Sequence, residues 1–246
     1  MLGVLGEAAD AVVGAFADQQ NWGMSGLRPD QYVADLVADE AVLGVLGAAG
    51  IRVLSEESGL QEDGFQEGNG LIAVVDPLDG STNASLQLGL FATSLCVVDE
   101  HGPWLAVVHD HPGKRRYTAI RGGGATLDGA PLASPREIAL SEAVVAVNGV
   151  PPRQASWWQF RALGCCALEL CAVAEGRFAG YVDFSGSLHV WDYLGALLVC
   201  SEVGVAVVDC EGRDLTVIDQ EAMRSPVAAA SSLLPQLLSV RRNTVD

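Results

Sequence analysis

The chain has 246 residues, of which 50% are hydrophobic and 18% are charged, so it carries enough apolar material for a sizeable core. Its net charge of −17 disfavours nucleic acids and anionic membranes as partners. No apolar run reaches transmembrane length. The N-terminal stretch lacks a basic leader and carries Glu7 and Asp10, which favours an amphipathic first helix over a signal peptide. We therefore expect a cytoplasmic protein.

Helices and short strands are predicted along the first half of the chain. Helical spacing covers residues 2–20 and 35–49, and the second helix closes at Gly47 and Gly50. Strand patterns follow over 51–57, 71–77, 91–99, 103–111 and 115–121. Residues 122–131 predict a glycine-rich loop, which lacks the spacing of a nucleotide-binding fingerprint.

The second half repeats this alternation. Helices are predicted over 163–176 and 189–204, and each ends at a glycine. Strands are predicted over 143–149, 178–184, 205–212 and 226–231. Because hairpins are frequent, the order of elements favours layered mixed sheets of the α+β or α/β class over one parallel sheet. No linker or repeat divides the chain, so we expect a single domain over residues 1–246.

The six cysteines lie in apolar surroundings, and none belongs to a Cys-x-x-Cys pair. This pattern favours small core residues of a reducing compartment over zinc ligands. The four histidines have no nucleophile partner that the sequence makes evident. His109 and His111 would share one face of a strand, but no third metal ligand accompanies them.

Acidic residues follow two of the predicted strands. The stretch SEES, residues 55–58, is followed by VVDPLDGST, residues 74–82, and Asp192 opens a late helix. Strand ends and a helix start can meet in one crevice, where carboxylate oxygens suit Mg²⁺. The alternatives are ordinary turn chemistry at Asp-Pro and Asp-Gly, and plain helix capping by Asp192. The spacing alone leaves both interpretations open.

Three motifs together resemble the inositol monophosphatase family of magnesium-dependent, lithium-sensitive phosphatases. They are SEES, then VVDPLDGSTN, then HVWDYLGALLV, in the family's order and with Asp76 twenty residues after Glu56. Further similarity runs from about residue 30 to residue 232. The resemblance implies an αβαβα sandwich. It also places most metal ligands in an N-terminal half of about 1–140, and the substrate-ring side in a C-terminal half of about 141–246.

The resemblance implies a role for each residue that matches the motifs. The expected metal ligands are Glu56, Asp76, the Leu78 carbonyl, Asp79 and Asp192, and they would hold two or three Mg²⁺ ions. Ser81 stands where the family usually has threonine, and with Asp35 it would orient the attacking water; Glu56 or Asp35 would accept the proton. The amides of Gly80, Ser81 and Thr82 would bind phosphate.

The resemblance further implies a substrate side. The segment Gly164-Cys165-Cys166 would border the substrate ring, and Asp183 would bind a sugar hydroxyl, although its stretch is two residues longer than usual. The family's threonine-alanine pattern before Asp35 is replaced by Tyr32-Val33-Ala34, and the lysine often found ahead of it has no clear counterpart.

The expected activity is hydrolysis of inositol monophosphate or a similar polyol phosphate by a homodimer. The alternatives are a histidinol-phosphate, fructose-bisphosphate or nucleotide-bisphosphate phosphatase, and a catalytically silent metal-binding homologue.

Overall fold

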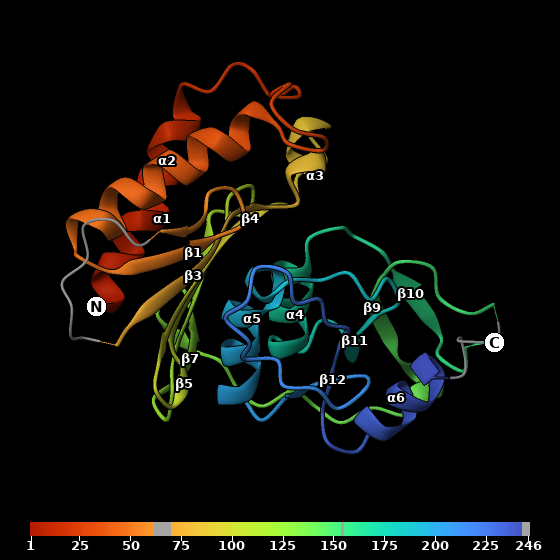
Figure 1. The fold of residues 1–246 in the computed structure, drawn as a ribbon. Helices are drawn as coiled ribbons and strands as arrows, with labels where there is room; N and C mark the ends of the chain where they lie inside the picture. The colour runs from red at the N-terminus through yellow and green to blue at the C-terminus, as the bar shows by residue number, and fades with distance from the viewer. Residues whose placement is uncertain (62–69, 154, 243–246) are drawn as a thin grey trace.

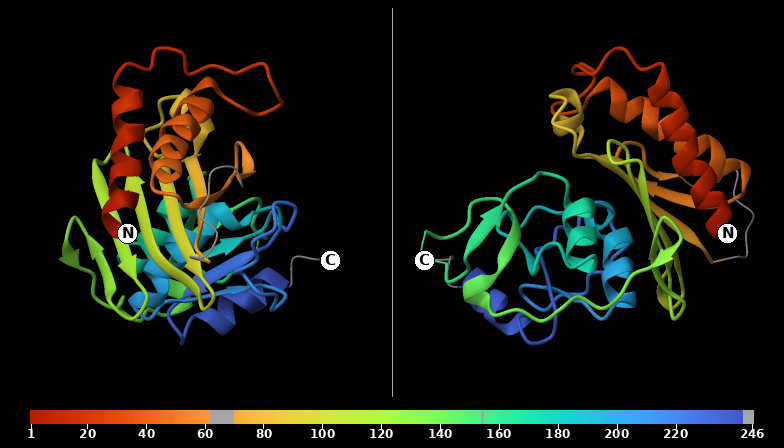
Figure 2. Two further views of the ribbon diagram at one scale, coloured as in Figure 1. Left: turned by 60° about the vertical axis from the view of Figure 1, so that its left-hand side comes forward. Right: turned by 180° about the vertical axis from the view of Figure 1, so that it is seen from behind.

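The computed structural model describes residues 1–61, 70–153 and 155–242. Five layers follow one another, as Figure 1 shows: two helices, a large sheet, two helices, a smaller sheet and a last helix. Figure 2 shows the same order from two further sides. This is the αβαβα arrangement expected from the sequence. Among the described residues, no helix is both long and apolar enough to cross a membrane.

The first two layers are built from the N-terminal half. Helices α1 (Leu2–Ala17) and α2 (Val33–Ala48) pack on one face of an eight-stranded sheet with the order β2-β1-β3-β4-β5-β6-β7-β8. Its strands are β1 (Arg52–Ser55), β2 (Gly59–Gln61), β3 (Ile72–Asp79), β4 (Ala92–Asp99), β5 (Gly102–Asp110), β6 (Arg115–Ile120), β7 (Gly124–Leu127) and β8 (Ala130–Pro131). The short helix α3 (Ser81–Ser85) follows β3 directly.

The remaining layers come from the C-terminal half. Helices α4 (Cys166–Ala174) and α5 (Val190–Glu202) lie between the two sheets, and α6 (Leu234–Arg242) covers the far side of the second. That sheet has the order β10-β9-β11-β13-β12. Its strands are β9 (Val144–Asn148), β10 (Gln159–Arg161), β11 (Gly180–Asp183), β12 (Ala206–Asp209) and β13 (Pro226–Ala229), and a 3-10 turn, η1 (Leu140–Glu142), precedes β9.

Alternation along the strands explains why these layers stack. On β3, Ile72 and Val74 join the core shared with α4 and α5, whereas Ala73 and Val75 join the core under α1 and α2. Successive side chains of a strand point to opposite faces, so a strand that is apolar throughout is buried on both sides. The middle core contains residues of both sheets, and a third core lies under α6.

Two parts of the secondary structure differ from the sequence prediction. The expected glycine-rich loop at 122–131 contains β7 and β8, because Tyr117 to Ile120 of β6 pair with Gly124 to Leu127 across a tight glycine turn. The short elements β2, α3, β10 and α6 were not predicted. The first three have only three to five residues, too few for a clear periodic pattern, and α6 has nine.

Candidate active site

Strand β3 carries two of the predicted ligands at its end. Asp76 pairs with Ser94 of β4 and Asp79 pairs with Ala92, so two residues, Pro77 and Leu78, stand opposite one. This is a β-bulge, which bends a strand and changes the direction of its side chains. Asp76 Oδ1 accepts a hydrogen bond of 3.0 Å from the Leu78 amide. The bulge therefore sets the directions of both carboxylates.

Glu56 lies next to Asp76 because β1 runs parallel to β3. Ser55 is in register with Val75, and the Glu56 amide donates to the Val75 carbonyl at 3.1 Å. The carboxyl groups of Glu56 and Asp76 hydrogen-bond to each other. Burial, followed by repulsion from Glu57, raises the pKa of Glu56 to about 8. Burial and the neighbouring carboxylates Glu56, Asp79 and Asp192 raise the pKa of Asp76 well above its usual range.

Asp192 is the third residue of α5, and its Oδ2 accepts a 2.7 Å hydrogen bond from the His189 amide at the helix start. Helix capping, the alternative considered from the sequence, is therefore real. Burial and repulsion from Glu56 and Asp79 raise the pKa of this aspartate as well. Asp192 thus caps its helix. It also belongs to the group formed by Glu56, Asp76, Asp79 and Asp192, which we call the acidic cluster.

Asp79 joins the large sheet to the start of α4. Its Oδ2 accepts hydrogen bonds from the Ala167 amide at 2.7 Å and from the Cys165 thiol at 3.2 Å. These hydrogen bonds favour the ionised carboxylate and lower its pKa. Burial has the larger effect and raises the pKa of Asp79 to about 6. Cys165 and Cys166, predicted to border the substrate, are both buried, with Cys165 at the N-cap of α4 and Cys166 at its first position.

Gly80 lets the chain turn from β3 into α3. Its φ of 84° lies in the left-handed region, and a Cβ there would meet the carbonyl oxygens of Leu90 and Gly164 at 3.0 and 3.2 Å. Asn83 fixes the helix by donating to the carbonyls of Leu163, at 2.7 Å, and Gly164, at 3.2 Å. The first amides of a helix have no partner within the helix, so this turn can bind an anion.

Asp35 is the third residue of α2. Its Oδ2 accepts a 2.7 Å hydrogen bond from the Tyr32 amide, whereas its buried Oδ1 has no hydrogen-bond partner in the part of the chain that the structure describes. Burial, opposed by the bond from Tyr32 and assisted by Glu57, raises the pKa of Asp35 to about 7. The Tyr32 hydroxyl lies 3.1 Å from Thr82 Oγ1. Within α3, the described hydroxyl that contacts the start of α2 is thus that of Thr82, and the Ser81–Asp35 pair stays a prediction.

A group of residues next to Glu56 was not singled out from the sequence. Arg28 and Gln31 both donate to the Glu57 carboxylate, and the Ser55 hydroxyl donates to Asp39 on α2. Glu57 is therefore already paired, which leaves Glu56 as the acid of this pair that faces Asp76. Arg28 lies 29 residues before its partner, and no local pattern reveals such a contact.

Asp183 is held by the protein itself. With 0% exposure, it accepts hydrogen bonds from Asn148 Nδ2, from the amide and hydroxyl of Ser185, and from the Gly186 amide, all between 2.7 and 3.1 Å. These contacts stabilise the turn after β11. The predicted contact of Asp183 with a substrate hydroxyl stays a prediction.

The acidic cluster fits Mg²⁺ by its chemistry. Glu56, Asp76, Asp79 and Asp192 present only oxygen donors, and the main charges that act on Asp76 are all carboxylates. In the described parts of the chain, no three such side chains already close around a common point. Instead, the neighbouring carboxylates raise the pKa of Asp76, and a bound cation would offset this repulsion.

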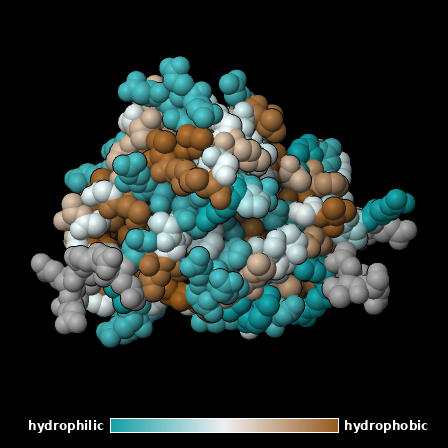
Figure 3. Space-filling view, turned by 45° about the horizontal axis from the view of Figure 1, so that its top comes forward, coloured by the Kyte–Doolittle hydropathy of each residue, from teal (hydrophilic) through white to brown (hydrophobic). Residues whose placement is uncertain are grey.

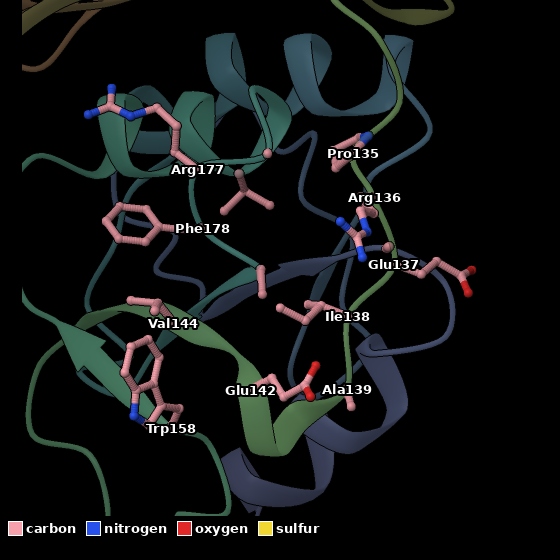
Figure 4. Close-up of a pocket in the computed structure, with 14 residues that line it drawn as sticks. Pro135, Arg136, Glu137, Ile138, Ala139, Glu142, Val144, Trp158, Arg177 and Phe178 are labelled. Carbon is pink, nitrogen blue, oxygen red and sulfur yellow. The ribbon is translucent and has the colours of Figure 1, made fainter.

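The pocket drawn in Figure 4 is a different place. It has a volume of about 480 Å³ and lies between the end of α4 and the start of β9, with Ile138, Trp158 and Phe178 in its wall. None of the predicted ligands lines it. The surface view in Figure 3 shows apolar side chains gathered in patches between hydrophilic ones. We therefore assign the candidate active site from the cluster of acids and not from the size of a pocket.

A family model for the inositol monophosphatase family matches residues 29–245. The chain belongs to this family. The family consists of metal-dependent phosphatases. The three motifs that resemble this family are also the ones that contain the four acids of the cluster.

The similar proteins carry several names. A fructose-1,6-bisphosphatase/inositol-1-monophosphatase of Methanothermobacter thermautotrophicus is 29% identical over 81% of this chain and 78% of that protein. An inositol-1-monophosphatase of Mesorhizobium japonicum is 31% identical over 80% and 79%. A solved structure of a hypothetical Pyrococcus horikoshii protein with similarities to inositol-1 monophosphatase has a TM-score of 0.81 at 25% identity, covering 97% and 95%. The chain is thus a phosphatase of the inositol monophosphatase and fructose-bisphosphatase superfamily.

Proposed function

We propose that this protein is a magnesium-dependent phosphomonoesterase that hydrolyses inositol monophosphate or a similar polyol phosphate. The observation that carries the proposal is the uncompensated acidic cluster of Glu56, Asp76, Asp79 and Asp192 beside the start of α3. Asp76 and Asp79 are buried, Glu56 and Asp192 are half-buried, and the neighbouring carboxylates raise the pKa of Asp76. Such an arrangement is costly for the fold, so it favours a functional role over a structural one.

In this proposal the four acids and the Leu78 carbonyl hold two or three Mg²⁺ ions. The chemistry that bound Mg²⁺ supplies is the acidification of water and the neutralisation of phosphate charge. The amides of Gly80, Ser81 and Thr82 bind the phosphate at the start of α3. We also propose a homodimer, a cytoplasmic location and, as the family resemblance implies, inhibition by lithium.

The proton of the attacking water goes to Glu56 or, through the Ser81 hydroxyl, to Asp35. The unpaired Oδ1 of Asp35 supports this role, since a buried oxygen without a donor remains free to accept one. Gly164, Cys165 and Cys166 border the substrate in the proposal, and Asn83 ties α3 to this segment. The expected contact of Asp183 with a ring hydroxyl is left out of this proposal, because its carboxylate already accepts four hydrogen bonds from Asn148, Ser185 and Gly186.

A second candidate substrate is fructose 1,6-bisphosphate. Several similar proteins carry this activity in their names, including one of Pyrococcus furiosus that is 27% identical over 85% of this chain. The acidic cluster would serve either ester, because it acts on the phosphate and not on the alcohol.

A screen of phosphate release tests the proposal. The purified protein is assayed over polyol, sugar, histidinol and nucleotide phosphates, with Mg²⁺ and with excess EDTA. We expect hydrolysis of inositol monophosphate only with Mg²⁺, and a loss of several orders of magnitude in Asp76→Asn. The matched control Asp99→Asn alters a surface pair with Arg121 and should keep full activity. Full activity in EDTA, or a near-normal turnover number in Asp76→Asn, would refute the metal assignment.

A further inference from the structure

A chain of two hydrogen bonds reaches the β3 bulge from a neighbouring strand. Thr93 on β4 is the single residue opposite Pro77 and Leu78, and it is fully buried. Its hydroxyl donates to the Pro77 carbonyl at 2.8 Å. The same oxygen lies 2.8 Å from Nε2 of His111, which follows β5. None of these three residues belongs to the ligand set described above.

The chemistry of the groups fixes the direction of both bonds. A carbonyl oxygen can only accept, so the one hydrogen of the Thr93 hydroxyl points to Pro77. The hydroxyl oxygen must then accept from His111, which requires hydrogen on Nε2. Burial, followed by the charges of His109 and Arg116, lowers the pKa of His111 to about 3, so the ring is neutral. His111 therefore carries its hydrogen on Nε2 and leaves Nδ1 as an acceptor.

Aromatic neighbours hold the His111 ring in this orientation. Phe91 stacks on it with an interplanar angle of 21° and a centroid distance of 5.7 Å, and Phe16 lies 5.0 Å away. The His109 ring is nearly perpendicular to it, at 84°, with the two centroids 4.9 Å apart. With Trp22, these residues line a pocket of about 750 Å³ beside α3. The ring is thus fixed from several sides while its Nε2 faces Thr93.

We infer that Thr93 and His111 are positioning residues, which hold the bulge between Asp76 and Asp79 in the shape needed for metal binding. Proline has no N–H to give to the sheet, and a bulge interrupts the ladder, so this segment lacks the hydrogen bonds that fix an ordinary strand. The bond from Thr93 to the Pro77 carbonyl replaces part of that constraint. The inference rests on the proposed function only where Mg²⁺ affinity is the quantity measured.

The first test needs no metal. In protein labelled with ¹⁵N at histidine, the ring nitrogen shifts at neutral pH report the tautomer, and we expect His111 as the neutral Nε2–H form. In Thr93→Val, which keeps the shape but removes the hydroxyl, this preference should weaken and the Leu78 amide should exchange faster. An Nδ1–H ring in the wild type, or unchanged exchange at Leu78 in the variant, would overturn the inference.

The second test uses rescue and metal affinity. The amide nitrogen of glutamine can reach the position of Nε2, whereas that of asparagine corresponds to Nδ1. We therefore expect His111→Gln to retain Mg²⁺ affinity by calorimetry, and His111→Asn and Thr93→Val to lose about tenfold, the scale of one hydrogen bond. Thr118→Val removes the Thr118–Thr126 pair on β6 and β7 and serves as the control.

The results separate the inference from the proposed function. Equal affinities for Thr93→Val and Thr118→Val, or equal losses for His111→Gln and His111→Asn, would refute the positioning role. A wild-type protein that binds no Mg²⁺ would refute the proposed function, and the tautomer and the Leu78 exchange would then decide the inference alone.

Discussion

Three aspartates near the candidate site use one carboxylate oxygen for a helix start. Asp35, Asp79 and Asp192 accept the amides of Tyr32, Ala167 and His189, each at 2.7 Å. Capping and metal binding compete as interpretations of such a sequence, yet a carboxylate has two oxygens and can serve both. The cap fixes the side chain in place, which is what a ligand or a proton acceptor needs.

Asp183 is the residue whose role an experiment decides most directly. Its carboxylate already accepts four hydrogen bonds from Asn148, Ser185 and Gly186, so we expect Asp183→Ala to destabilise the fold. Hydrolysis of inositol phosphate and of an aryl phosphate should then fall by the same factor. Thermal unfolding and the two kcat/KM values measure this. A loss of roughly 1.5–3 kcal/mol confined to the polyol substrate would instead make Asp183 a binding residue.

At the scale of elements, local patterns predicted the long helices, the central strands and the position of the acids. Each of the motifs SEES, DPLDGSTN and HVWD is a continuous stretch of sequence, so each could be recognised without any knowledge of contacts. The rest depends on pairings between distant residues. Asn83 meets Leu163 eighty residues away, and Thr93 meets His111 only because β4 and β5 pair in one register. Sequence patterns carry no information on such registers until the fold is known.

Helix α4 offers a prediction of pH dependence. Glu169 has 1% exposure and accepts the Leu163 amide at 3.0 Å, and burial raises its pKa from 4.5 to about 8. A folded-state pKa above the unfolded value stabilises the protein at low pH, and that contribution is lost as the pH rises from about 4.5 to 8. Glu169→Gln keeps the acceptor and cannot ionise. Its stability relative to the wild type should therefore increase over this range.

Urea midpoints of both metal-free proteins at several pH values measure the effect, with the exposed Glu137→Gln as control. Parallel curves for the wild type and Glu169→Gln would show that Glu169 does not titrate in this window.

At the scale of the whole molecule, the candidate site joins parts of the chain that are far apart in sequence. Asp76 and Asp79 lie on β3 of the first sheet and Glu56 directly follows β1, whereas Asp192 comes from α5. Bound Mg²⁺ would therefore stabilise the folded state, by about 2.7 kcal/mol at a hundredfold excess over Kd. The melting temperature of the wild type should rise with Mg²⁺, and that of Asp192→Asn should rise less.

Because the net charge is −17, added ions also reduce repulsion across the surface. The titration therefore includes NaCl at matched ionic strength. If NaCl raised the melting temperature as much as MgCl₂ does, the stabilisation would come from screening and not from a site.

The segment 132–139 forms no helix or strand and leads from the first sheet towards the second. Glu56, Asp76 and Asp79 precede this segment in the chain, and α4 and Asp192 follow it. During synthesis the first sheet therefore emerges with three of the four acids but without α4, whose start holds Asp79, and without Asp192. A copy of the chain that stops before α5 would lack Asp192 and have an incomplete set of the expected ligands. In this architecture, activity would begin only after α5 has been synthesised and has joined the first sheet.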